Sequence, residues 1–138
     1  MAGSMNTPDS IPIASMSEPL IFICASDAVQ EGGRGVRFPV TAHGEDGTAF
    51  VVRYENQARA YLNRCAHIPV ELDWNEGEFF ESSGLYLMCA THGALYEPDT
   101  GRCAGGPCRG GKLLPIRVVE QDQKISWQPD EFVRPARA

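Results

Sequence analysis

The sequence lacks any long run of apolar residues. Its uninterrupted apolar stretches extend over a handful of positions, far short of the roughly 20 that span a bilayer. The N-terminus also lacks a basic segment followed by an apolar one, so no secretory signal is expected. Both absences favour a soluble, cytoplasmic protein without a membrane partner. In that compartment the five cysteines are more typical of metal binding than of disulfides.

Positive charge is scarce as well. Lys and Arg total 12 against 18 Asp and Glu, which leaves a formal net charge of −6. This balance argues against a nucleic-acid partner, because binding to phosphates depends on Lys and Arg. It suits solubility and docking to a basic protein instead. The 138 residues, 43% of them apolar, predict one domain with its own core.

Neither an internal repeat nor a long amphipathic helix is visible, and the apolar residues gather in short runs separated by turn residues. This pattern predicts an all-β fold, a small antiparallel β-barrel or sandwich. The segment HGEDG, residues 43–47, is expected to form a tight turn between two strands. The predicted strands cover residues 20–24, 36–42, 48–55, 58–64, 85–89, 112–120 and 124–128.

Composition also suggests how the chain is organised. Residues 1–17, rich in Ser, Thr and Pro, are expected to form a flexible arm, within which residues 1–5 are set aside as a candidate cloning remnant. The main domain is expected at 18–130. Within it, the glycine-rich residues 62–111 form an insertion on the rim of the barrel. The polar residues 131–138 are predicted to be a frayed tail.

Two short stretches, CAH and CATH, hold two of the five cysteines and two of the three histidines. The spacing is Cys65-x-His67, then twenty-one residues, then Cys89-x-x-His92. Two tight turns of this kind supply two sulfur and two nitrogen ligands. Gly93 follows His92 and would ease a close approach of the backbone to a bound group.

Three explanations compete for this pattern. The pairs could be accidental, which two matched pairs flanked by Gly and Pro make the weakest choice. They could bind structural zinc, because two thiolates and two imidazoles suit a tetrahedral ion. Zinc fingers, however, group Cys with Cys and His with His, whereas each stretch here mixes them. A [2Fe-2S] cluster in which two His replace two Cys on one iron explains the mixture, and we favour it.

The motif C-x-H … C-x-x-H-G followed by GGP resembles that of the Rieske [2Fe-2S] family. The family's third, proline-containing loop, which covers the cluster, is matched by GGPC at 105–108. The stretch CATHGALYEPDTGRCAGGPCRGGKL, residues 89–113, resembles small bacterial Rieske ferredoxin-like proteins along its whole length. The likeness covers about residues 60–115. It implies a Rieske fold in which 62–111 is the cluster-binding subdomain.

The resemblance also implies roles for individual residues. Cys65 and Cys89 would bind one iron, and His67 and His92 the other at an exposed tip. Gly93, Gly106 and Pro107 would pack around the cluster.

High-potential members carry a Ser and a Tyr after the second His, both of which donate hydrogen bonds to the cluster sulfurs. The matching positions here are Ala94 and Tyr96. One donor is therefore missing, and we expect an intermediate reduction potential. An alternative leaves the Tyr96 hydroxyl in water, with the ring serving only to pack.

The disulfide that joins the two cluster loops in respiratory members is absent, because Val70 and Thr91 occupy its positions. Cys103 and Cys108 flank the third loop instead. They could form a disulfide that holds this loop over the cluster, or remain free thiols as a reducing cytosol favours. The sequence leaves both states open.

Other singular residues receive simpler interpretations. Cys24 is expected in the core and His43 in a solvated turn. Between the two motifs, the aromatic residues Trp74, Phe79 and Phe80 are expected to pack inward while the neighbouring acids face water. A functional alternative is an acidic docking patch at this place for a basic redox partner.

The function implied by the resemblance is that of a soluble one-electron carrier and not an enzyme in its own right. It would pass electrons from a flavin-dependent reductase to a terminal oxygenase. Nothing in the chain matches the facial triad of a catalytic mononuclear iron site. One alternative is the small Rieske-like subunit of a nitrite reductase or of another redox complex. A second is a zinc-stabilised interaction module.

Overall fold

The computed structural model describes residues 19–66 and 68–136, and within these ranges the chain is built from β-strands and two short 3-10 turns. The predicted all-β class is therefore confirmed. The predicted arm at 1–17 lies outside the described residues. The elements are β2 (Ile21–Ala25), η1 (Ser26–Ala28), β3 (Val36–Ala42), β4 (Glu45–Tyr54), β5 (Gln57–Leu62), β6 (Leu87–Met88), β7 (Leu95–Tyr96), β8 (Cys103–Gly105), η2 (Gly106–Cys108), β9 (Pro115–Ile116), β10 (Val118–Gln121), β11 (Lys124–Trp127) and β12 (Val133–Pro135).

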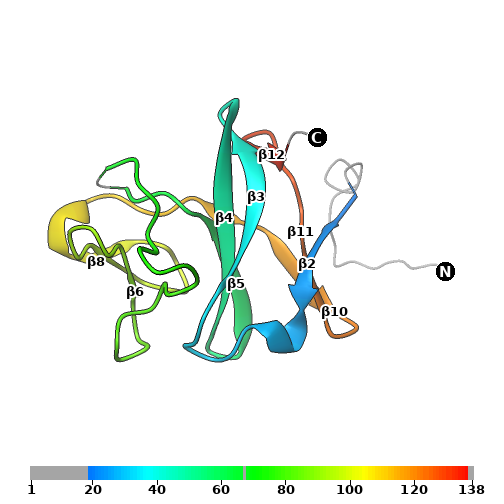
Figure 1. The fold of residues 1–138 in the computed structure, drawn as a ribbon, viewed down its shortest axis with the longest axis horizontal. Helices are drawn as coiled ribbons and strands as arrows, with labels where there is room; N and C mark the ends of the chain where they lie inside the picture. Colours follow the sequence, from blue (N-terminus) through cyan, green and yellow to red (C-terminus); the bar gives the residue numbers. More distant parts are fainter. Residues whose placement is uncertain (1–18, 67, 137–138) are drawn as a thin grey trace.

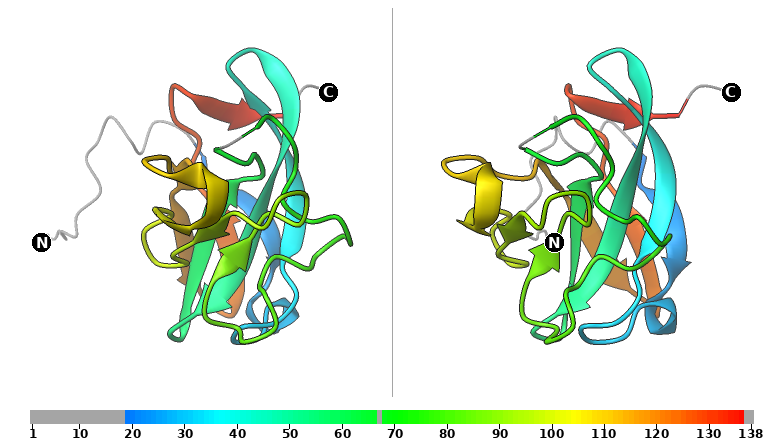
Figure 2. Two further views of the ribbon diagram at one scale, coloured as in Figure 1. Left: turned by 90° about the vertical axis from the view of Figure 1, so that its left-hand side faces the viewer. Right: turned by 60° about the vertical axis from the view of Figure 1, so that its left-hand side comes forward.

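The strands form three antiparallel sheets. Five strands follow the order β12-β3-β4-β5-β9, three follow β10-β11-β2, and three short ones follow β6-β7-β8. Figure 1 shows β4 near the centre, with β6 and β8 on one side of it and β2, β10 and β11 on the other. Figure 2 shows the long β3–β4 hairpin curving over the molecule. The β10-β11-β2 sheet and the small β6-β7-β8 sheet therefore lie on opposite sides of β4.

Three hairpins close through two-residue turns in which both residues have a positive φ. The turn residues are His43 with Gly44, Glu55 with Asn56, and Asp122 with Gln123. Turns of this kind match the right-handed twist of the paired strands. The turn predicted over 43–47 is shorter than expected, because β4 already begins at Glu45. The exposed position of His43 agrees with the prediction.

Strand β4 buries both of its faces. Ala49 and Val51 belong to the barrel core, whereas Phe50 and Val52 belong to a second apolar cluster under the β6-β7-β8 subdomain. All four side chains are fully buried. Successive side chains of a strand point to opposite faces, so one unbroken apolar run serves two cores.

The barrel core takes its largest side chains from the other strands. Trp127 on β11 packs against Phe38 on β3 with ring centroids 5.5 Å apart. Ile125 and Val40 are almost completely buried in the same cluster. Cys24 also lies in this core, as predicted.

The C-terminal segment differs from the prediction. Within 131–138, expected as a frayed tail, Val133–Pro135 form strand β12 and pair with β3 at Ala42, Thr41 and Val40. Val133 is only 2% exposed. The Asp130 carboxylate accepts hydrogen bonds from the backbone N–H groups of Phe132 and Val133, both at 2.8 Å. This turn redirects the chain onto the open edge of β3, which local composition does not reveal.

Arg53 on β4 ties the two barrel sheets together. Its guanidinium donates two hydrogen bonds to the Glu120 carboxylate on β10, at 2.7 and 3.1 Å. It also donates to the carbonyl oxygens of Val29 at 3.1 Å and Ser26 at 2.9 Å. The side chain is 14% exposed, so solvent screens these bonds only in part. Charge-assisted bonds with this geometry contribute more than surface ion pairs do.

Replacing Arg53 by Gln is expected to lower the free energy of unfolding by about 2 kcal/mol, because charge-assisted bonds to Glu120 are lost. Urea denaturation at neutral pH measures this loss. The matched control is Arg59→Gln, since Arg59 pairs with the exposed Glu55 only at 3.8 Å and should matter by less than about 0.5 kcal/mol. Equal losses of unfolding free energy in the two variants would contradict the stabilising role assigned to Arg53.

The same bond predicts a pH dependence. Hydrogen bonding from Arg53 holds the pKa of Glu120 below its usual value. A carboxyl group with a lowered folded-state pKa stabilises the fold above the unfolded-state pKa, and this contribution is lost as the pH falls through the folded-state pKa. Wild type should therefore lose stability more steeply than Arg53→Gln below about pH 4.3. Parallel acid profiles would contradict the prediction.

Candidate metal centre

Two loops with the same backbone closure carry the Cys/His motifs. The first loop, residues 64–70, follows β5, and the second loop, residues 89–94, joins β6 to β7. In the first, the N–H of Cys65 donates to the carbonyl of Val70 at 2.8 Å. In the second, the N–H of Cys89 donates to the carbonyl of Ala94 at 2.8 Å. The N–H of each cysteine therefore bonds to the carbonyl five residues later.

The two cysteines are buried in one apolar cluster. Cys65 is 4% exposed and Cys89 is 1% exposed, and both belong to the cluster that packs on Phe50 and Val52. Burial raises the pKa of the Cys89 thiol, and the side chain of Cys65 adds to this rise. Both sulfurs therefore belong to one buried apolar cluster. Thiolates at this place would need a cation to compensate them, which is the environment of a metal ligand.

His92 lies on the exposed part of the second loop, between Thr91 and Gly93, which are exposed too. His67, the other predicted nitrogen ligand, lies outside the described residues. Among residues 19–66 and 68–136, no three His, Cys, Asp or Glu side chains converge on a single ion position. The described part of the site thus has a buried sulfur side and an exposed imidazole side.

The predicted covering loop packs directly on the second cluster loop. Gly106, with φ +81°, begins the turn η2, and a Cβ added there would lie 2.9 Å from the carbonyl oxygen of Gly93 and 3.1 Å from Cα of Ala94. Only glycine suits both the backbone angle and this contact. Pro107 follows on the exposed surface. The GGPC segment therefore packs on the second cluster loop, and its role as a cover of the cluster stays a prediction.

A disulfide closes the covering loop. The sulfurs of Cys103 and Cys108 are bonded, and the two Cα atoms lie 5.6 Å apart. Cys108 is buried in the same apolar cluster as Cys65 and Cys89. Of the two states that the sequence left open, the structure has the bonded one. Cys24, Cys65 and Cys89 are not part of a disulfide.

Tyr96 directs its hydroxyl at the Cys65 sulfur. The hydroxyl oxygen lies 3.2 Å from Sγ of Cys65 and accepts a hydrogen bond from the N–H of Ala66 at 2.9 Å. Tyr96 is fully buried, and burial, with a contribution from Cys65, raises its pKa. The hydroxyl keeps its proton and, with the Ala66 N–H donating to its oxygen, can donate that proton to the sulfur. The alternative that places this hydroxyl in water does not hold.

Ala94, at the position of the second donor, offers only a methyl group. Its side chain is fully buried and packs in the same apolar cluster. Its carbonyl closes the second loop by accepting from Cys89. The site therefore has one hydroxyl donor next to a cysteine sulfur and an apolar contact at the other position.

The aromatic residues between the motifs behave differently from one another. Phe79 is fully buried and stacks on Phe50 with ring centroids 3.9 Å apart, and Phe80 is half-buried. Trp74 was predicted to pack inward, and this prediction is wrong because its side chain is 82% exposed. The turn around it is held by hydrogen bonds of its neighbours, so the indole is not needed for packing.

The acids of this segment are held by arginines of the barrel. Arg37 on β3 donates to Glu71 at 2.6 Å, and Arg34 pairs with Glu78 at 3.4 Å. The prediction that the acids of this segment face water is wrong for Asp73, which is buried and hydrogen-bonded to the buried Asn63. The sequence analysis did not single out Asn63. A polar residue at the end of an apolar strand, two positions before Cys65, was the available signal for Asn63.

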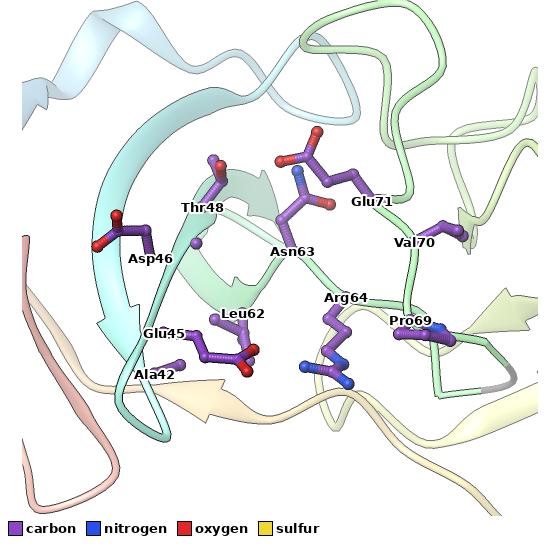
Figure 3. Close-up of a pocket in the computed structure, with 11 residues that line it drawn as sticks. Ala42, Glu45, Asp46, Thr48, Leu62, Asn63, Arg64, Pro69, Val70 and Glu71 are labelled. Atoms are coloured by element: carbon purple, nitrogen blue, oxygen red, sulfur yellow. The ribbon is translucent and has the colours of Figure 1, made fainter.

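A pocket of about 300 Å³ lies between the β3–β4 hairpin and the first cluster loop (Figure 3). Charged groups of both signs line it: Glu45 and Asp46 come from the hairpin, and Arg64 and Glu71 come from the loop side. Neither Cys65 nor Cys89 lines this pocket. It therefore adjoins the first cluster loop without opening the buried sulfurs to solvent.

This donor set fits an iron–sulfur centre. Two buried thiols lie together, a hydroxyl donor points at one of them, and a glycine-dependent cover packs on the second loop. Two irons divide their ligands between two positions, so three side chains need not meet at one point. The fold and the site thus define an iron–sulfur electron-transfer domain.

Comparison with known proteins identifies the family. The family model described as Rieske [2Fe-2S] domain matches residues 20–122. The chain belongs to this family, and its cofactor is a Rieske [2Fe-2S] cluster. This finding sets the zinc alternative aside. Search of the curated proteins found no match.

Solved structures with the same fold include two ferredoxins and an oxygenase. The ferredoxin of carbazole 1,9a-dioxygenase from Nocardioides aromaticivorans IC177 is 22% identical, with 80% of this chain and 98% of that chain covered and a TM-score of 0.63. The Sphingomonas yanoikuyae B1 ferredoxin is 17% identical, with 81% and 100% covered and a TM-score of 0.62. The terminal oxygenase of carbazole 1,9a-dioxygenase from Novosphingobium sp. KA1 is 20% identical, with 87% and 32% covered and a TM-score of 0.63.

The described part of the chain contains no helix that is both long and apolar enough to cross a membrane.

The ligand assignment itself remains a prediction: Cys65 and Cys89 would hold one iron, and His92 with His67 would hold the other. When bound, the cluster supplies a one-electron acceptor. The chain buries Cys65 and Cys89, orients the Tyr96 hydroxyl toward Cys65 and leaves His92 at the surface.

Replacing Tyr96 by Phe should lower the reduction potential of the cluster, because a hydrogen bond to a cysteine sulfur stabilises the reduced state. The ring and its packing are kept, so the fold should persist. Voltammetry on the loaded protein measures the potential, and Tyr61→Phe is the control. The Tyr61 hydroxyl donates to the carbonyl of Pro98 at 2.8 Å and contacts no sulfur. A potential unchanged by Tyr96→Phe would show that this bond does not tune the cluster.

Replacing Cys103 and Cys108 together by Ser should lower the free energy of unfolding by about 2 kcal/mol, because the unfolded chain is no longer cross-linked. Urea denaturation measures the loss, and Cys24→Ser, elsewhere in the chain, reports the cost of a serine without a bridge. Alkylation of the wild type without reductant, followed by mass spectrometry, should leave Cys103 and Cys108 unlabelled. Labelling of both would assign the thiol state to the purified protein.

Proposed function

We propose that the chain is a one-electron carrier that receives electrons from a flavin-dependent reductase and delivers them to a terminal oxygenase. The proposal is supported most by the match to the Rieske family over residues 20–122. The chain also aligns with nearly the full length of two ferredoxins, but with only about a third of an oxygenase chain. One of the similar structures is described as a complex of reduced oxygenase and oxidized ferredoxin.

The geometry of the site supports the same function. Cys65 and Cys89 are buried on one side of the site, and His92 is exposed on the other. Electron transfer to another protein requires one edge of the site to reach the surface while the rest is shielded from water. A partner that docks on the second loop would meet the imidazole of His92 directly. The predicted cytoplasmic location remains a prediction.

The experiment combines a redox titration with a transfer assay. Reduction by dithionite should consume one electron per chain and produce a Rieske-type EPR signal. The reduced protein is then mixed by stopped flow with a purified terminal oxygenase component, and its oxidation is followed by absorbance. We expect oxidation within the turnover time of the oxygenase, whereas metal-free protein should transfer nothing.

The alternative, a small subunit of a nitrite reductase, predicts a different result. The protein would then form a stable stoichiometric complex with its enzyme and would not exchange with free copies during turnover. Size-exclusion chromatography of the protein mixed with the candidate enzyme distinguishes a stable complex from a carrier that exchanges. A fixed complex together with no transfer to an oxygenase would overturn the proposal.

A further inference from the structure

Asn63 joins the end of strand β5 to the first cluster loop, and both ends of its side chain are used. The residue is 4% exposed. Its Nδ2 donates to Oδ1 of Asp73 at 3.0 Å, and its Oδ1 accepts from the N–H of Leu72 at 2.8 Å. Its own backbone N–H donates to the carbonyl of Thr48 on β4 at 2.8 Å. Figure 3 shows the side chain directed toward the segment that carries Glu71.

Asp73 is a buried carboxylate with its charge compensated from the barrel. Its side chain is fully buried. Beside the bond from Asn63, it accepts the N–H of Gly77 through Oδ2 at 2.9 Å, and Nε of Arg37 lies 3.7 Å from the same oxygen. The two donated hydrogen bonds and the neighbouring guanidinium of Arg37 compensate this buried carboxylate. Arg37 belongs to β3, so this pair joins the subdomain to the barrel.

Leu72 connects this pair to the second cluster loop. Its N–H is held by Asn63, and its carbonyl accepts the N–H of Ala90 at 3.0 Å. Asn63 stands two residues before Cys65, and Ala90 directly follows Cys89. One residue of backbone therefore bridges the two segments that carry the buried cysteines.

We propose that Asn63 and Asp73 are positioning residues of the cluster site: Asn63 fixes the distance between the two cysteine loops, and the compensated Asp73 charge sets the cluster's reduction potential. The inference rests on the proposed electron-carrier function, for which the potential is the relevant property. It concerns residues that neither the family motif nor the ligand set includes.

The electrostatic part follows from the sign of the charges. Reduction adds one electron, so a nearby negative charge disfavours it and a nearby positive charge favours it. Because Asp73 is buried, water screens its charge less than that of an exposed acid. Removal of the Asp73 charge should raise the potential, and removal of the Arg37 charge should lower it. A purely structural role predicts no such opposition of sign.

Two pairs of variants test this proposal, all with the cluster loaded and its iron and sulfide content measured. Asp73→Asn keeps the shape and removes the charge, and its midpoint potential should shift positive. Glu71→Gln is the matched control, since Glu71 also contacts Arg37 but is 47% exposed, and its shift should be smaller. Arg37→Gln should shift the potential negative, whereas Arg37→Lys keeps the charge and should restore most of the wild-type value.

The positioning role of Asn63 is measured by EPR and by cluster retention. Asn63→Ala should change the g values of the reduced protein and speed cluster loss, because the link to Leu72 and the second loop is removed. Asn56→Ala, in an exposed turn far from the site, should leave both unchanged. Thermal unfolding followed by circular dichroism reports the folding of every variant.

The results that overturn the proposal are specific. They are shifts of the same sign in Asp73→Asn and Arg37→Gln, equal potentials in Arg37→Gln and Arg37→Lys, or wild-type g values and retention in Asn63→Ala. If Asp73→Asn does not fold, the two Arg37 variants still decide the electrostatic part. If the Asp73 and Arg37 variants shift the potential as expected but the protein transfers no electrons to an oxygenase, the proposed function is overturned and this inference stands.

Discussion

Strand β4 buries both of its faces, and the position of the cluster site depends on this constraint. Ala49 and Val51 complete the barrel core, while Phe50 and Val52 form the floor of the subdomain. Phe79 stacks on Phe50 from the segment between the two motifs. Because β4 is part of a packed barrel, the loops that pack on Phe50 and Val52 have a rigid support. Backbone bonds at Cys65 and Cys89 then close each loop in the same way.

The buried hydroxyl of Tyr96 and the buried amide of Asn63 are hydrogen-bonded within the chain, which fixes their orientation beneath the loops. The Tyr96 hydroxyl contacts Cys65 and Ala66, and Asn63 bonds to Asp73 and Leu72. Unsatisfied polar groups at such depth would be costly, so each of these partners is required once the group is buried. The acidic segment over 71–78 is thereby held to the barrel through Arg34 and Arg37 instead of standing free in solvent.

Local pattern predicted most of the barrel strands, because alternation and turn residues act over short distances. It missed β7 and β8, and the single strand predicted over 112–120 is two strands, β9 and β10, in different sheets. The segment 36–42 coincides with β3, and 124–128 differs from β11 by one residue. It failed where long-range contacts decide. Val133 joins β3 only because Asp130 turns the chain back, and Trp74 stays exposed because hydrogen bonds of its neighbours already hold the turn. Composition could not distinguish these cases from a frayed tail and an inward-packed ring.

The sequence by itself determined the cofactor class, since one Cys and one His in each of two turns suit a cluster with sulfur on one iron and nitrogen on the other. Through the resemblance of GGPC to the family's third loop, it also predicted a covering segment at Gly106 and Pro107, and Gly106 packs on the second cluster loop. Tertiary structure alone decided which groups surround that centre. For Cys103 and Cys108 the sequence left a bond and two thiols open, and the structure has the bond. The contact of Tyr96 with Cys65 and the link from Asn63 to Ala90 through Leu72 join residues whose approach depends on packing over β4. Such approaches are set by the folded backbone, and no local spacing encodes them.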